Sequence, residues 1–186
     1  MKSVLISILP RWCEKIASHK KTVEVRKSIP KFERPFKCYI YMSQGDLKDL
    51  GSYSEWIYKN RMKVIGEFVC DWITKITPHC DIKDFVNQYI HGYPAILGDN
   101  DCLSFNDMKA YLGNKKGYDW HISDLKIYDK PKELSEFYRP CSYSGICYSC
   151  NRFRPNGTPN DKPNDFCDGE ITRPPQSWQF AEELEK

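Results

Sequence analysis

The sequence of 186 residues lacks several features that mark common classes of protein. It has no apolar run of the roughly 18–20 residues that a bilayer-spanning helix needs, so no contact with a membrane is expected. No glycine-rich phosphate loop follows an apolar segment, which gives a nucleoside triphosphatase or a dinucleotide enzyme little support. No internal repeat or heptad pattern is visible. The length then indicates one domain, or one domain with an appendage.

Neither sign of charge is in large excess. The 28 Lys and Arg residues stand against 25 Asp and Glu residues, a formal net charge of +3. This balance excludes histone-like wrapping of nucleic acid, but it leaves room for a local basic patch. The N-terminal apolar run has no small-residue cleavage site before Arg11, so it is interpreted as a buried strand and not as a signal peptide. A soluble, cytoplasmic protein is expected.

Aromatic residues and cysteines are abundant. The chain has 9 Phe, 5 Trp, 12 Tyr and 9 Cys. An odd number of cysteines without a secretory signal argues against a disulfide framework. Reduced thiols, some in the core and some on a metal, fit better.

Periodicity predicts an α+β fold. The predicted strands cover residues 3–9, 22–26, 36–42, 63–73 and 118–128, and the predicted helices cover 11–18, 81–90 and 104–112, with mixed helix and turn at 46–60 and a helical turn at 132–137. Two short strands follow the first helix directly. This order favours a small mixed β-barrel with flanking helices over a doubly wound sheet.

The most informative residues are Lys21, Thr22, Glu24 and Arg26. Strict alternation places Thr22, Glu24 and Arg26 on one face of a strand, with Lys21 at its start. Cations beside a carboxylate can hold a phosphate or a nucleobase edge. The plainer interpretation is an exposed strand face with Glu–Arg pairing, worth less than about 1 kcal/mol.

The same segment resembles the ASCH family of the PUA-like superfamily, whose opening motif is L-S-I-x-P, a helix, and then G-x-K-x-x-E-x-R. The match runs from Leu5-Ile6-Ser7-Ile8-Leu9-Pro10 through Lys20–Lys27 and covers about the first 43 residues. The stretches 120–125 and 171–178 look like a phage and prophage branch of that family. His19 stands near the family's usual turn glycine.

The resemblance implies a PUA-like barrel with a cleft for RNA or a modified base. Some relatives are amidohydrolases of acylated cytidines or ribonucleases. The small amidohydrolases use a Lys, a Thr three residues later, and a Glu. Lys21 matches that Lys, but Glu24 occupies the Thr position and Thr22 is offset, so activity is not carried over. Lys21 and Glu24 are the catalytic candidates if the chain is an enzyme, and Glu67 is a candidate second acid.

Several aromatic side chains lie near the matched motifs. Trp12 and Tyr39 could stack bases at about 1–3 kcal/mol each, and His121 could act as an acid or base. Core packing is the simpler role for each of them. The expected ligand-binding set is Lys21, Thr22, Glu24, Arg26, Trp12, Tyr39 and His121.

Residues 138–170 have almost no hydrophobic periodicity and contain four cysteines. Cys141, Cys147, Cys150 and Cys167 form C-x5-C-x2-C-x16-C, which predicts a structural zinc site that orders the segment. Unliganded or redox-active thiols are the alternative. Arg139 and the other basic residues of the segment could add a second nucleic-acid surface or stay solvated. The remaining cysteines are expected to be buried thiols.

The sequence therefore predicts a barrel over 1–137, a zinc-binding insert over 138–170 and a C-terminal strand over 171–186 that returns to the barrel. The preferred function is binding of RNA, or of a nucleotide or modified nucleoside, in the Lys/Glu/Arg cleft, without catalysis. One alternative is a nucleoside amidohydrolase or ribonuclease that uses the same cleft. Another is a phage counter-defence protein that inhibits a host nucleic-acid enzyme by protein–protein contact.

Overall fold

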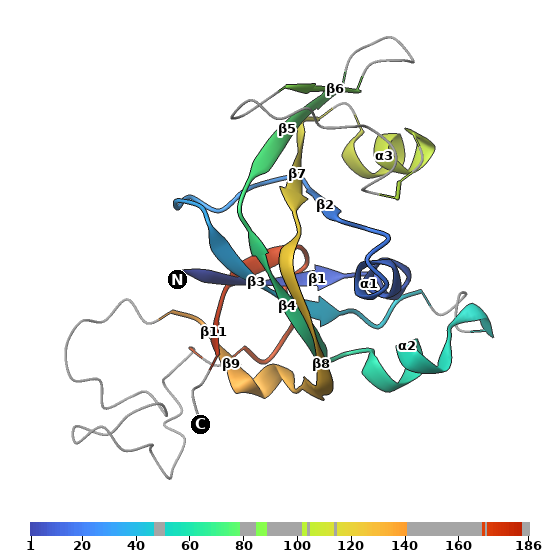
Figure 1. The fold of residues 1–186 in the computed structure, drawn as a ribbon, viewed down its shortest axis with the longest axis vertical. Coiled ribbons are helices and arrows are strands. Elements are labelled where there is room, and N and C mark those ends of the chain that lie inside the picture. Colours follow the sequence, from blue (N-terminus) through green and yellow to red (C-terminus); the bar gives the residue numbers. More distant parts are fainter. Residues whose placement is uncertain are drawn as a thin grey trace, which may run out of the picture.

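A computed structural model describes residues 1–46, 51–78, 85–88, 102–103, 105–113, 115–140, 169 and 171–183. The fold is α+β and mostly sheet (Figure 1). The strands are β1 (Ser3–Ile8), β2 (Val23–Arg26), β3 (Phe36–Met42), β4 (Val64–Cys70), β5 (Ile73–Pro78), β6 (Phe85–Gln88), β7 (Gly117–His121), β8 (Ser123–Lys132), β9 (Phe137–Tyr138), β10 (Trp178–Phe180) and β11 (Glu182–Glu183). The helices are α1 (Pro10–Ala17), α2 (Glu55–Asn60), α3 (Phe105–Leu112) and the short 3-10 helix η2 (Leu134–Glu136).

The larger sheet has five strands in the order β10-β1-β3-β4-β8. Its central strands β1 and β3 are parallel and covered on both faces. Val4, Ile6 and Ile8 face one apolar cluster, which includes Trp120. Leu5 points to the other face, into a second cluster with Tyr39 and Phe137. Burial on both sides explains why β1 is almost continuously apolar.

The second sheet has four strands in the order β2-β7-β5-β6. Helix α3 packs on it through Met108 and Leu112, which contact Val25 and Ile76 in a third apolar cluster. In Figure 1 most of this sheet and α3 lie above strand β1 of the larger sheet. Helix α1 begins with Pro10, directly after β1, because a first-turn proline needs no hydrogen-bond partner for its nitrogen.

Two long ribbons connect the sheets. The predicted strand at 63–73 corresponds to β4, and β5, which begins at Ile73, was not predicted. The predicted strand at 118–128 is divided into β7 and β8. The Asp71 carboxylate accepts a hydrogen bond from the Trp72 backbone N–H at 3.0 Å where the first ribbon bends. Strands that switch sheets at such bends make the corners of a folded sheet, which local alternation in the sequence does not reveal.

The predicted helix at 81–90 is wrong for its described residues, 85–88, and its other residues lie outside the described ranges. Residues Phe85–Gln88 form β6, which pairs antiparallel with Lys75–Pro78 of β5. Pairing with β5 satisfies the backbone of this segment, so a tertiary contact overrides the helical spacing. The predicted helices at 11–18 and 104–112 and the helical turn at 132–137 are confirmed, with shifted ends.

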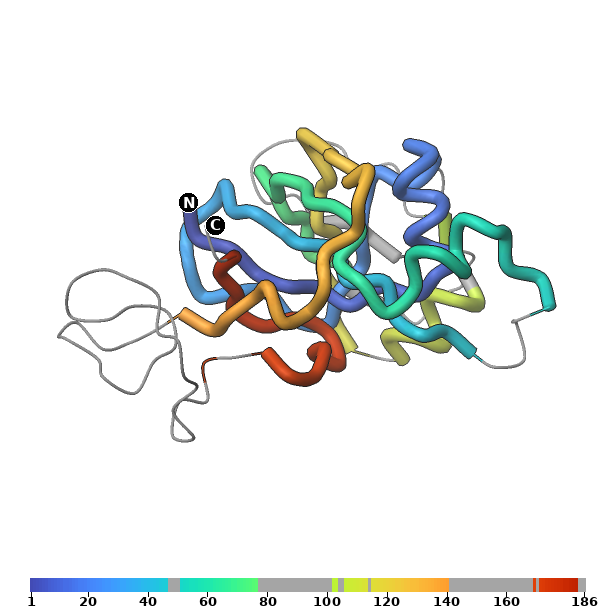
Figure 2. The backbone as a smooth tube through the Cα atoms, turned by 90° about the horizontal axis from the view of Figure 1, so that it is seen from below, coloured from blue at the N-terminus to red at the C-terminus, as the bar shows by residue number. Residues whose placement is uncertain are grey.

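The described strands form three sheets, the third being the two-stranded pair β9–β11. A mixed α+β fold is thus confirmed, whereas a closed barrel is not shown in this part of the chain. Figure 2 shows the red C-terminal segment beside the blue start of the chain, where β10 pairs antiparallel with β1. No helix among the described residues is long and apolar enough to cross a membrane.

Candidate ligand-binding cleft

Three charged side chains of the predicted motif meet below the surface. Lys21 Nζ lies 3.4 Å from Glu24 Oε2, and Arg26 Nη2 lies 3.1 Å from Glu24 Oε1. Arg26 Nη2 also donates a hydrogen bond to the Ser7 carbonyl oxygen at 2.6 Å. Lys21, Glu24 and Arg26 are 1%, 5% and 6% exposed. The plain interpretation of an exposed, solvated strand face is therefore wrong.

The turn after α1 explains why Lys21 points inward. The chain reverses at His19, whose φ is 58°, and the backbone N–H groups of Lys20 and Lys21 both donate to the Lys15 carbonyl. This φ lies in the left-handed region that glycine adopts most easily. Strand β2 then begins, and its alternation places Glu24 and Arg26 on the same face of the sheet. Trp120 on β7 lies directly opposite Glu24 and is buried on that face.

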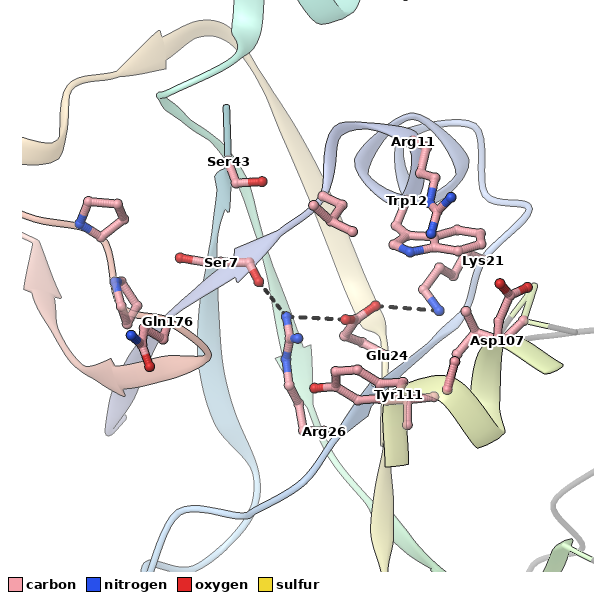
Figure 3. Close-up of a pocket in the computed structure, with 16 residues that line it drawn as sticks. Ser7, Arg11, Trp12, Lys21, Glu24, Arg26, Ser43, Asp107, Tyr111 and Gln176 are labelled. Carbon is pink, nitrogen blue, oxygen red and sulfur yellow. Dashed lines mark hydrogen bonds and ion pairs between the residues drawn. The ribbon is translucent and has the colours of Figure 1, made fainter. Parts of the chain in front are cut away.

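These charges lie in a hollow of about 630 Å³, here called the cationic cleft. Figure 3 shows Trp12 of α1 and Tyr111 of α3 on either side of the Glu24 carboxylate, with Asp107 beside Lys21. The cleft is also lined by Ser7, Ser43, Arg11 and the segment 174–176, and by the apolar residues Leu9, Val25, Leu103 and Ala110. The cleft thus brings together a row of buried charges, two aromatic rings and several hydroxyls, from elements far apart in the sequence.

Aromatic rings and cations are paired at the rim of the cationic cleft. The Trp12 ring centroid lies 4.7 Å from the Arg11 guanidinium carbon and 5.5 Å from Lys21 Nζ. Lys27 Nζ lies 4.8 Å from the Tyr111 ring centroid. Such contacts hold the rings in place and add positive potential to their faces.

Some polar atoms of the cationic cleft are buried without a hydrogen-bond partner in the described part of the chain. These atoms are Ser7 Oγ, Ser43 Oγ, Arg26 Nε and Glu24 Oε2. A buried polar group that forms no hydrogen bond costs roughly 1–3 kcal/mol, so native proteins rarely leave one without a purpose.

Three of the predicted ligand-binding residues lie outside this lining. Thr22 is half-buried and does not line the cleft. Tyr39 packs against Phe137 at 4.9 Å in the second apolar cluster, because alternation turns it away from the face of Cys38 and Ile40. The expected set within the cleft is accordingly reduced to Lys21, Glu24, Arg26 and Trp12.

His121 is also placed elsewhere. Its ring stacks on Trp72 at 4.9 Å between centroids, and its Nδ1 lies 2.6 Å from Asp71 Oδ1. It follows Trp120 along β7, so alternation directs it to the opposite face of the sheet. This geometry fits the structural role that the sequence also allowed.

Glu67 belongs to a separate polar cluster. It accepts hydrogen bonds from the Tyr128 hydroxyl at 2.6 Å and from Lys37 Nζ at 3.1 Å. Burial raises the pKa of Glu67, but these two hydrogen bonds outweigh it and hold that pKa below its usual value. Burial and the Glu67 contact raise the pKa of Tyr128 well above its usual value. Glu67 is therefore not a second acid of the cationic cleft.

The predicted zinc ligands Cys141, Cys147, Cys150 and Cys167 lie outside the described residues. Within the described ranges, no group of three or more His, Cys, Asp or Glu side chains is arranged to hold a metal. Cys13, Cys38 and Cys70 are buried free thiols, and burial raises the pKa of each.

Sequence reasoning missed several cleft residues. Ser7 lies inside the matched N-terminal motif, so a signal for it was present. Ser43 follows β3, and Tyr111 and Asp107 lie on α3; each of these is an ordinary polar or aromatic residue by sequence. Only folding brings them next to Glu24, and no spacing rule would single them out.

Comparison with solved structures finds the ASCH protein of Zymomonas mobilis. A serine-to-alanine mutant of that protein is similar with a TM-score of 0.52 and 17% identity, over 96% of this chain and 87% of the other. The protein itself gives 0.49 and 20% over the same shares, and a tyrosine-to-phenylalanine mutant gives 0.49 and 21% over 72% and 77%. No protein-family model and no curated protein matches the chain. The similarity concerns the fold.

Proposed function

We propose that the chain is an ASCH-type, PUA-like domain that binds RNA, or a nucleotide or modified nucleoside, in the cationic cleft. The observation that carries this proposal is the buried Lys21–Glu24–Arg26 row on the floor of an open hollow. The fold similarity and the resemblance of the N-terminal motif support it.

The chemistry of the cationic cleft fits a nucleotide. The Trp12 and Tyr111 rings offer faces for a base, and base–aromatic stacking is worth about 1–3 kcal/mol. Three cationic side chains (Arg11, Lys21 and Arg26) line the cleft against the carboxylates of Glu24 and Asp107. The Ser7 and Ser43 hydroxyls can donate to or accept from base and sugar edges. An apolar ligand would leave these groups without partners.

The volume supports a ligand of that size. The cationic cleft measures about 630 Å³, within the roughly 300–1,000 Å³ typical of small-molecule and cofactor sites. Such a hollow admits one nucleotide and excludes a double helix. Single-stranded RNA, whose bases are free to turn outward, is therefore the favoured polymer.

A catalytic use of the same cleft is the second candidate. The contact of Lys21 Nζ with Glu24 Oε2 at 3.4 Å places two groups within reach of proton transfer. Thr22 does not line the cleft, so the hydroxyl candidates for a nucleophile are those of Ser7 and Ser43. We prefer binding, because both oxygens of Glu24 already face a cation.

The test is a fluorescence titration of short single-stranded RNA and DNA at two salt concentrations. Wild type is compared with Lys21→Met, which removes a buried charge but keeps the methylene chain, and with Arg11→Ala at the exposed rim. Lys130→Ala, an exposed substitution that lines no part of the cleft, is the matched control. We expect salt-sensitive binding that Lys21→Met abolishes, Arg11→Ala weakens several-fold and Lys130→Ala preserves.

Recovery of the RNA after incubation separates the candidates. Intact RNA supports binding, whereas cleaved or deacylated product that is lost in Glu24→Gln supports the enzyme. Binding that ignores both Lys21→Met and Arg11→Ala would remove the ligand from this cleft. A chain that binds no nucleic acid would leave inhibition of a host protein as the function to test.

A further inference from the structure

A second hollow lies at the other end of β1 from the cationic cleft. It measures about 770 Å³, and Lys2, Lys31, Phe32, Arg139, Gln179 and Phe180 are among the residues that line it. We call it the β10 hollow, because the edge strand β10 supplies its wall. None of these residues lines the cationic cleft.

The floor of the β10 hollow is aromatic. The Phe32 and Phe180 ring centroids lie 5.3 Å apart at an interplanar angle of 41°. Phe180 is 42% exposed, which is high for a phenylalanine in a described element. Phe32 in turn packs edge-on against buried Phe36 at 5.0 Å, and Phe180 packs against Trp178 at 5.7 Å. Each of the two rings is therefore held by a neighbouring aromatic side chain, and Phe180 presents an exposed apolar surface.

The charge of the β10 hollow is positive. Its lining has the three cationic side chains Lys2, Lys31 and Arg139 against the single carboxylate of Glu182. Lys2 Nζ lies 5.6 Å from the centroid of the Phe32 ring. Cations around aromatic rings are the arrangement by which proteins hold single-stranded nucleic acid, with phosphates on the cations and bases on the rings.

The combination of cations and rings distinguishes between the possible ligand classes. An apolar peptide would not use the three cationic side chains, and an acidic peptide would not use the paired rings. The lining therefore favours a nucleotide over a protein partner.

The β10 hollow and the cationic cleft are lined by neighbouring positions of the same two segments, β1 and residues 174–180. Residues 174–176 line the cleft, and Gln179 and Phe180, only a few positions later, line the hollow. On β1, Ser7 lines the cleft and Ser3 lines the hollow. Four residues of extended strand separate them by roughly 13 Å, a distance that a few nucleotides of single strand can cover.

We infer that the β10 hollow is a second nucleotide subsite of the cationic cleft and that the ligand is a single-stranded oligonucleotide, not a free nucleoside. One nucleotide occupies the cleft, the strand follows β10, and a further base stacks on Phe32 and Phe180. This inference rests on the proposed function, from which it takes the ligand class and the first binding point.

The experiment compares two ligands, a mixed-sequence ribo-octanucleotide and ribonucleoside monophosphates. Binding of each ligand is measured by calorimetry to wild type and to the Phe180→Ala, Phe180→Trp, Lys31→Ala and Lys21→Met variants. Tyr58→Ala is the matched control, because Tyr58 is an equally exposed aromatic residue (44%) on α2, outside both linings. Thermal unfolding of each variant checks that the fold is kept.

We expect wild type to bind the octanucleotide at least tenfold more tightly than any monophosphate. Phe180→Ala weakens octanucleotide binding about tenfold, the loss expected for one base stack, and leaves monophosphate binding unchanged. Phe180→Trp and Tyr58→Ala bind the octanucleotide as tightly as wild type. Lys31→Ala lowers the salt slope of octanucleotide binding by about 1.

Other outcomes overturn one inference or both. If Lys21→Met abolishes binding while Phe180→Ala binds the octanucleotide like wild type, the cleft stands and the second subsite is refuted. If Phe180→Ala weakens binding while Lys21→Met does not, the hollow binds RNA and the proposed function of the cleft fails. A wild-type chain that binds neither ligand refutes both.

Discussion

At the residue scale, the charge on Glu24 organises the cationic cleft. Its two carboxylate oxygens face Lys21 and Arg26, at 3.4 Å and 3.1 Å, and all three side chains are almost fully buried. Two buried cations share this one carboxylate. Removing a partner from such a cluster costs much more than the cluster itself contributes, because it leaves buried charge uncompensated.

Glu24→Gln is expected to lower the free energy of unfolding by about 3–5 kcal/mol, because Lys21 and Arg26 then lose their shared anion. Urea unfolding measures this loss. Glu55→Gln is the control, since its pair with Lys59 on α2 is largely exposed and is worth at most about 1 kcal/mol. Equal stability of the two variants would show that Glu24 is not buried with its partners.

His19 is one of four non-glycine residues with a positive φ in the described part of the chain. Its φ of 58° favours glycine, the residue that the resembled motif has near this turn. His19→Gly is expected to raise the free energy of unfolding by roughly 0.5–1 kcal/mol, after the entropy cost of glycine in the unfolded chain. Ser18→Gly, at a φ of −87°, should instead lower it. A His19→Gly variant with a reduced melting temperature would contradict the turn.

At the element scale, β4 and β8 meet at an irregular register. A Cβ placed on Gly66 would clash with the Lys126 carbonyl oxygen and approach Ile127 Cα at 3.1 Å. Both atoms belong to the backbone of β8, so they cannot rotate away. The register shifts on either side of Gly66 show that the strands are already bent here.

Gly66→Ala is expected to destabilise the fold by about 1–3 kcal/mol, the usual cost of overpacking. Gly51→Ala serves as the control, because an added Cβ there meets nothing within 4 Å. Differential scanning calorimetry of both variants checks this. A Gly66→Ala protein as stable as wild type would mean that β8 can shift away from β4.

The four cysteines of the segment 138–170 lie outside the described residues, so a metal site there is proposed from the sequence alone. We propose that Cys141, Cys147, Cys150 and Cys167 bind one structural zinc, as their spacing predicts. Protein purified without chelator should contain about one equivalent by elemental analysis, and a Cys147→Ser/Cys150→Ser variant should contain almost none. Less than half an equivalent in wild type would rule the zinc out. Cys102→Ser, at a described and half-buried thiol, is the control.

At the scale of the whole molecule, many ionisable groups are buried in their neutral form. Burial is the main cause of the raised pKa of the thiols and phenols in this set, which are Cys13, Cys38, Cys70, Tyr39, Tyr41 and Tyr128. In the unfolded chain these groups lose their protons near their ordinary values, 9.0 for cysteine and 10.0 for tyrosine. In the folded chain the same thiols and phenols keep their protons to higher pH, because their pKa values are raised.

Unfolding therefore releases protons at alkaline pH. The resulting stability is fully present below about pH 9 and falls as pH rises through the unfolded-state values towards the raised native ones. Urea midpoints measured from about pH 8 to about pH 11 should decline steadily above pH 9. Tyr128→Phe should make the decline above pH 10 shallower. A midpoint independent of pH over this range would refute the neutral burial of these groups.

Much of this protein could be predicted from local patterns. Periodicity over a few residues predicts the strand 36–42, the helix after Pro10, and the common face of Glu24 and Arg26 on β2 with Lys21 just before it. Side-chain period and turn chemistry are properties of neighbouring residues, so the printed sequence contains them. The cleft's charged floor was predictable for the same reason.

The remaining features of the fold and of the cleft depend on long-range packing. Whether residues 85–88 form a helix or a strand depends on β5, with which they pair. Whether Tyr39 and His121 reach the cleft depends on which sheet face each strand presents to α1 and α3. The return of β10 to β1 joins residues about 170 positions apart, and both segments contribute residues to the lining of the β10 hollow. Such contacts form only when distant segments share a core, and no local pattern encodes them.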